Sequence, residues 1–122
     1  MSAALHHVAL ETPRARVDDC VAFFGLLGFA PVEVPDTLRG ESVWVERGGQ
    51  QIHLLLADDA AVPPRAHVAV VCPDYEATLE RLRAAGFEPA IRREHWGSPR
   101  CFVDDPAGHR VEVMSFPPPR AA

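Results

Sequence analysis

The chain has 122 residues, of which 48% are hydrophobic and 24% are charged, which is typical of one soluble globular domain. Its formal net charge of −5 argues against nucleic acid as a partner. No apolar run approaches the roughly 18 residues of a membrane span. The first residues lack the basic and apolar regions of a signal peptide. The three cysteines lack metal-type spacing, so we predict free thiols in the reducing cytoplasm.

The first half of the chain predicts one β-α-β-β-β unit. An alternating segment comes first, then apolar residues at helical spacing that stop at Gly28, then three more segments of strand character. The predicted elements are strand Leu5–Glu11, helix Val17–Leu27, strand Phe29–Val34, loop Pro35–Gly40, strand Ser42–Arg47 and strand Gln51–Leu56. The composition of residues 58–65 predicts a linker.

The second half predicts the same order of elements. They are strand Ala66–Cys72, helix Tyr75–Ala85, strand Phe87–Arg92, strand Arg100–Asp104 and strand Arg110–Ser115. We therefore expect a single domain over residues 1–122, with one module at about 5–57 and a second at about 66–116.

The two halves also match residue by residue. His7-Val8-Ala9 corresponds to His67-Val68-Ala69, and Gly28-Phe29 corresponds to Gly86-Phe87. His53 corresponds to Glu112 at an offset of 112 − 53 = 59. Matches at a nearly constant offset favour two copies of one unit over a single irregular α+β domain.

Strand alternation places four polar residues on equivalent faces. Aliphatic residues occupy one face of each predicted strand, and the opposite faces carry His7, His53, His67 and Glu112. Glu112 lies within an apolar strand, and a buried unpaired carboxylate is costly, so it must face water or meet a cation. The four side chains would converge if the modules pack about a two-fold axis.

Three stretches carry a resemblance to a known family. They are His7–Leu10, Phe23–Phe29 and Asp105–Glu112. In this order, and with the internal repeat, the chain resembles the vicinal oxygen chelate superfamily, which groups glyoxalases, bleomycin-resistance proteins and extradiol dioxygenases. The resemblance runs from Leu5 to about Phe116. It implies an α+β fold in which two tandem βαβββ modules form a curved, cup-like mixed sheet around a divalent metal, with the helices on the outer face.

The family's ligand positions fall on His7, His53, His67 and Glu112. The glyoxalase I branch usually has a carboxylate where this chain has His53, and other branches use only the remaining three positions. His53 is therefore a fourth ligand, a base beside the metal, or a polar residue of the cavity. Glu112 and His53 are the candidates for proton transfer. Imidazole and carboxylate donors suit Fe, Mn, Co, Ni or Zn and do not select among them.

Several further residues are candidates for contact with a ligand. Trp44 and Phe102 lie on matching strands, and they either pack in the core or line the substrate cup. The loop that carries Trp96 can close over the site. One arginine can hold a substrate carboxylate bidentately, although solvated surface is the simpler interpretation for each. These arginines are Arg39, Arg92, Arg93 and Arg100.

Three remaining residues are expected to lie outside the site. His6 adjoins His7 at the opposite strand parity, so we predict a surface or packing role for it. His109 follows a turn glycine and is predicted to be exposed. Cys101 is predicted to be a small core residue.

Three functions fit these features. The first is a metal-dependent lyase or isomerase of glyoxalase type, acting on a small molecule with neighbouring oxygens, in which the metal is a Lewis acid. The second is a metal-free protein that sequesters a small molecule, as in the bleomycin-resistance branch, and the negative charge would suit a cationic drug. The third is an Fe-dependent extradiol-type dioxygenase, although such chains usually carry further modules. Exposed sheet edges also predict a homodimer.

Overall fold

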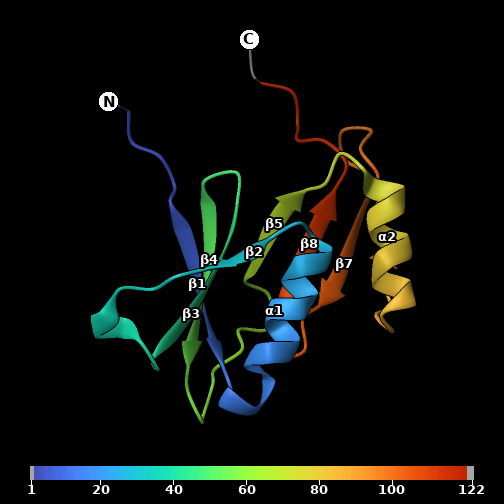
Figure 1. The fold of residues 1–122 in the computed structure, drawn as a ribbon. Helices are drawn as coiled ribbons and strands as arrows, with labels where there is room; N and C mark the ends of the chain where they lie inside the picture. The colour runs from blue at the N-terminus through green and yellow to red at the C-terminus, as the bar shows by residue number, and fades with distance from the viewer. Residues whose placement is uncertain (1, 121–122) are drawn as a thin grey trace. The chain divides into compact units, whose positions relative to one another are not determined.

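The computed structural model describes residues 2–120 (Figure 1). The chain divides between Val62 and Pro63 into two units, and in each of them the structure shows a four-stranded mixed sheet and one α-helix. The division falls inside residues 58–65, the stretch predicted as a linker. None of the helices within residues 2–120 has the length and apolar character that crossing a membrane requires.

The first unit follows the predicted order of elements. It contains β1 (His7–Thr12), α1 (Val17–Leu26), β2 (Ala30–Val32), β3 (Ser42–Arg47), β4 (Gln50–Leu56) and the short 3₁₀ helices η1 (Arg14–Arg16) and η2 (Asp36–Leu38). The strand order is β1-β4-β3-β2, with β1 parallel to β4 and the other pairs antiparallel. Pro13 ends β1 because it has no N–H for the ladder. Gly28 follows α1 with φ of 94°, a conformation that favours glycine.

The second unit repeats this topology. It contains β5 (His67–Val71), α2 (Tyr75–Ala84), β6 (Ala90–Ile91), β7 (Arg100–Asp104) and β8 (Arg110–Met114), in the strand order β5-β8-β7-β6. β6 is shorter than the predicted strand Phe87–Arg92. The backbone N–H of Phe87 instead donates to Leu82 O at 3.0 Å and closes the end of α2. Pro89 cannot donate to a ladder, so strand pairing starts only at Ala90.

The strand registers show that the units are two copies of one design. Trp44 lies opposite His53 in the β3–β4 pair, and Phe102 lies opposite Glu112 in the β7–β8 pair. The predicted α+β class with tandem βαβββ modules is therefore confirmed.

Each unit has its own apolar core on one face of its sheet. In the first unit the buried side chains include Phe23 and Phe24 of α1 with Ile52 and Leu54 of β4. In the second unit they are contributed by β5, α2, β7 and β8 and include Val70, Leu79, Leu82, Cys101, Val103, Val111 and Val113. None of the three cysteines forms a disulfide, as predicted, and all three are buried. The reducing compartment inferred from them stays a prediction.

Candidate functional site

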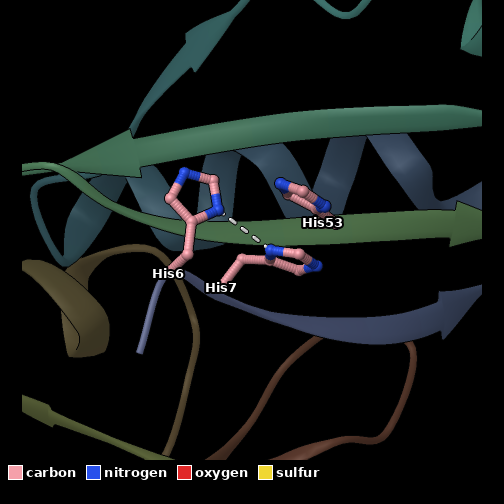
Figure 2. A group of neighbouring side chains, drawn as sticks. All are labelled: His6, His7 and His53. Carbon is pink, nitrogen blue, oxygen red and sulfur yellow. Dashed lines mark hydrogen bonds between the residues drawn. The ribbon is translucent and has the colours of Figure 1, made fainter. Parts of the chain in front are cut away.

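Three histidines cluster on the polar face of the first sheet (Figure 2). His53 of β4 lies between two aromatic partners, with its ring centroid 3.8 Å from that of His7 and 3.9 Å from that of Trp44. Both contacts are near-parallel stacks, with interplanar angles of 15° and 1°. His6 Nδ1 lies 3.0 Å from His7 Nδ1. One ligand atom from each of His6, His7 and His53 lies within 4.8 Å of the other two.

The surroundings of His53 keep its imidazole neutral. His53 is only 6% exposed, and its Nε2 lies 2.7 Å from Gln51 Oε1. When Nε2–H donates to that amide oxygen, Nδ1 keeps a free lone pair. Burial lowers the pKa of His53, and the charges that His7 and His6 can carry lower it further. A neutral imidazole is the form that binds a metal or accepts a proton.

His6 was predicted to have a surface or packing role; it lies on the surface as predicted, and it also joins the histidine cluster. The residue is exposed, but its ring contacts those of both His7 and His53. β1 begins at His7, so strand alternation does not determine where the side chain of His6 points. The His6-His7 doublet was the only available signal in the sequence.

His67 and Glu112 form the corresponding pair in the second unit. β5 runs parallel to β8 with Ala69 opposite Glu112, so His67 lies two residues before this pairing on the same face. His67 Nε2 is 3.1 Å from Glu112 Oε1, and His67 Nδ1 is 2.9 Å from Arg65 O. The other oxygen of Glu112 accepts a hydrogen bond from Arg100 Nε at 2.9 Å.

Glu112 therefore satisfies the requirement for a cation that its sequence position imposes. The residue is 7% exposed. Burial raises the pKa of its carboxyl group, but hydrogen bonds and charges from Arg100 and His67 outweigh burial and hold the pKa below the ordinary value. The carboxylate is ionised at neutral pH.

Both groups have donor chemistry that fits a divalent transition metal. The first unit offers imidazole nitrogens, and the second offers an imidazole and a carboxylate. When His67 Nδ1–H donates to Arg65 O, a hydrogen bond typical of metal-ligating histidines, Nε2 is an acceptor. Nε2 and the carboxylate oxygen, 3.1 Å apart, are then both acceptors, so a proton or a cation must lie between them.

The residues predicted to contact a substrate do not all line the same pocket. Phe102 and Arg100 line a pocket of about 520 Å³ in the second unit, together with Arg92, Arg93 and His95. Trp96 is not among the residues that line this pocket, and its indole N–H donates to Phe116 O at 2.8 Å. Arg39 and Trp44 line a different pocket, in the first unit.

His109 is buried, with 4% exposure, although the sequence predicted that it would be exposed. Asp105 Oδ1 accepts hydrogen bonds from the backbone N–H groups of Ala107 and His109, each at 2.9 Å. This turn folds the chain back and buries His109 at the start of β8. Gly108 lies in a turn, as predicted, but the effect of this turn on the side chain of His109 is not visible in the sequence.

Known proteins match both the sequence and this architecture. The sequence model of the Glyoxalase/Bleomycin resistance protein/Dioxygenase superfamily matches residues 4–113. "Glyoxylase I 4" of Arabidopsis thaliana is 26% identical, over 92% of this chain and 70% of that protein.

Solved structures show the same fold. A glyoxalase family protein from Bacillus anthracis has a TM-score of 0.84 and 25% identity, over 93% of this chain and 95% of that one. Lactoylglutathione lyase from Agrobacterium tumefaciens has a TM-score of 0.71 and 21% identity, over 93% of each chain.

The repeated βαβββ module with a buried polar residue on its central strand defines a class of two-module α+β proteins. Within that class, this chain belongs to the glyoxalase, bleomycin resistance protein and dioxygenase superfamily, as the sequence resemblance predicted.

Proposed function

We propose that the protein is a metal-dependent lyase or isomerase of glyoxalase type that acts on a small molecule with neighbouring oxygens. The observation that carries the proposal is a pair of polar side chains that occurs in the same arrangement in both units. A buried polar side chain on a central strand, His53 or Glu112, contacts a histidine from the adjacent parallel strand, His7 or His67. The similarity to the Arabidopsis glyoxylase supports the same reaction class.

The predicted metal donors are His7, His53, His67 and Glu112, and the structure adds His6 as a neighbour of the first two. A divalent metal bound by such donors supplies Lewis acidity. The chain's own residues orient the donors: Gln51 fixes the His53 ring and the Arg65 carbonyl fixes the His67 ring. The one free lone pair of neutral His53, on Nδ1, can serve either the metal or a transferred proton, so His53 is a ligand or a base.

Metal analysis tests the proposal directly. Protein purified without added metal, and protein loaded with Fe, Mn, Co, Ni or Zn, would be assayed for bound ion before and after chelation. We expect wild type to hold a divalent metal, and His67→Ala and His53→Ala to bind it more weakly by about tenfold or more. His95→Ala, which removes a histidine outside the donor set, is the matched control. A wild-type protein that retains no divalent metal under any loading condition contradicts the proposal.

The ion pair of Glu112 with Arg100 favours a second candidate function, a metal-free protein that sequesters a small molecule. Arg100 and His67 already satisfy both oxygens of the carboxylate, so the fold does not need a metal to bury Glu112. Ligand binding to chelator-treated protein separates the two functions. Tight binding that is indifferent to metal supports sequestration.

We also propose a homodimer, because the sheets end in strands whose outer edges have no partner strand within residues 2–120. Light scattering with size-exclusion chromatography measures the mass. A species of the 13.3 kDa chain mass over a wide range of concentration would contradict the dimer.

A further inference from the structure

The pocket of the second unit is unusually rich in arginine. Its volume is about 520 Å³, which is within the range of small-molecule sites. Five of the 12 basic residues of the chain line it, and no carboxylate does. The lining residues are Arg65, Arg92, Arg93, Arg100 and Arg110, together with His67, Ile91, His95 and Phe102.

Only one of these five guanidinium groups has a carboxylate partner within residues 2–120. Arg100 pairs with Glu112, whereas the other four form no ion pair in that part of the chain. The uncompensated arginines are Arg65, Arg92, Arg93 and Arg110. Their positive charges lie around one cavity, so an anion in it would be attracted from several sides.

Phe102 brings three of the charges close together. The guanidinium carbons of Arg110, Arg92 and Arg100 lie 4.6, 5.0 and 5.2 Å from its ring centroid. Cation–π attraction holds each group at the ring, but the three like charges repel one another. A bound anion would relieve this repulsion.

The internal repeat shows that the fold itself does not require these charges. Arg100 pairs with Met114 as Ser42 pairs with Leu55, and Arg110 pairs with Asp104 as Gln51 pairs with Glu46. At these two positions the first module has neutral polar side chains, Ser42 and Gln51, where the second has arginines.

The positive charge of the pocket does not follow from the net charge of the second unit, which is zero. Residues 63–122 contain eight arginines and eight acidic residues, 8 − 8 = 0. Residues 1–62 contain four arginines and nine acidic residues, 4 − 9 = −5, so the acidic excess of the chain lies in the first unit. The overall negative charge thus gives no reason to expect a cationic ligand in this pocket.

We propose that this pocket binds a small organic anion with two negative charges, carried by a phosphoryl group or by two carboxylates, whose apolar part rests on Ile91 and Phe102. Guanidinium forks match the geometry of both oxyanions. The inference deepens the proposed function by naming the charge class of the substrate. Anion binding by the pocket does not depend on the proposed function; only the identification of the anion as a substrate rests on it.

Calorimetry on metal-stripped protein tests the proposal with phenyl phosphate, phthalate, inorganic phosphate and benzylamine. We expect saturable binding of phenyl phosphate or phthalate with a Kd of about 1 mM or tighter. Binding should weaken as salt is added, because salt screens the guanidinium charges. Inorganic phosphate should bind more weakly because it has no apolar part, and benzylamine should not bind.

Two variants localise the binding. Arg110→Gln gives β8 the side chain that β4 has at the equivalent position, and it should weaken binding of the tighter anion by about tenfold. Arg92 lies just outside β6, and its backbone N–H donates to Arg100 O at 3.0 Å, a bond that a side-chain substitution leaves in place. Arg92→Gln should therefore act in the same direction. Arg83→Gln on α2 removes the same charge outside the pocket and should leave the Kd within about twofold.

The outcomes separate the two possible headgroups and the two proposals. Tighter binding of phenyl phosphate assigns a phosphoryl ligand, and tighter binding of phthalate assigns a dicarboxylate. No saturable binding of any anion, equal losses in Arg110→Gln and Arg83→Gln, or equally tight benzylamine binding would overturn the inference. Because the protein is metal-stripped, anion binding can persist when metal loading fails, so each proposal fails by its own measurement.

Discussion

Glu112 and His53 occupy equivalent positions on β8 and β4, and each is kept buried by different means. Glu112 is held by charge, with its two oxygens bonded to Arg100 and His67. His53 is held by ring stacking and one hydrogen bond to Gln51. A buried carboxylate needs a cation, whereas a neutral imidazole needs only a polar partner and close packing.

Loss of the Arg100 guanidinium should destabilise the second unit. Arg100→Gln leaves the buried carboxylate of Glu112 without its strongest partner, and we expect a loss of about 2–3 kcal/mol in the free energy of unfolding. Urea unfolding of chelator-treated protein measures it. Arg83→Gln should change stability by less than about 0.5 kcal/mol. Adding Glu112→Gln to Arg100→Gln should recover part of the loss, and equal losses in the two single arginine variants would refute the ion-pair argument.

At the scale of the elements, the sequence predicted the first and last residues of several strands and helices well, because nearby turn and helix-ending residues determine them. Strands Ser42–Arg47 and Arg100–Asp104 are as predicted, and α1 differs from its prediction by one residue at its end. β2 and β6 are exceptions, because both start later than predicted: the backbone N–H groups of Phe29 and Phe87 close α1 and α2 and do not pair with a strand. Which of two available hydrogen-bond partners a backbone group takes depends on packing that periodicity does not describe.

Two glycines at the end of α1 should respond oppositely to alanine. Gly28 has a φ of 94°, and an added Cβ would lie 2.9 Å from Arg47 Nε, so Gly28→Ala should cost about 1–2 kcal/mol. Gly25 lies within the helix with open space around a Cβ, so Gly25→Ala should stabilise by up to about 1 kcal/mol. Thermal unfolding compares them, and a shift of the same sign in both would contradict this account.

The start of α2 should contribute a pH-dependent stability. A hydrogen bond from Arg81 is the main cause that lowers the pKa of Asp74, aided by its own backbone and Thr78, against a smaller opposing effect of burial. The folded state thus favours the carboxylate, so this contribution is present above the ordinary pKa of 3.8 and is lost as pH falls below it.

Arg81→Gln should therefore be less stable than wild type near neutral pH, and the difference should shrink as the pH falls below 3.8. Denaturant unfolding across this range measures the gap. Arg83→Gln, on the same helix, should show no such convergence. A gap that stays constant or widens in acid would rule out the Asp74–Arg81 pair as its cause.

At the scale of the whole molecule, the chain is two copies of a module with separate apolar cores. The buried cysteines can serve as probes of the packing of both cores. Cys20 lies in the first unit, and Cys72 and Cys101 lie in the second, with exposures of 0%, 1% and 0%. Burial also raises the pKa of the Cys101 thiol, the largest influence on it, so the reactive thiolate is disfavoured there.

We expect native protein to resist alkylation at all three cysteines and urea-unfolded protein to react at all three. Mass spectrometry after treatment with iodoacetamide counts the modified thiols. The unfolded sample is the control for reagent activity. Rapid labelling of any one cysteine in native protein would contradict the packing of the unit that contains it.

The sequence alone determined the two-module fold and the polar strand faces, because strand alternation, turn residues and a repeat are properties of the chain itself. Three short motifs in a fixed order carried the resemblance to the superfamily. The sequence did not reveal that Arg100 pairs with Glu112, that His6 joins His7 and His53, or that Trp96 contacts the chain near Phe116. It also did not gather the arginines into one pocket. Only the tertiary structure decided these contacts, because they depend on which strands and loops become neighbours and on which rotamers reach a partner.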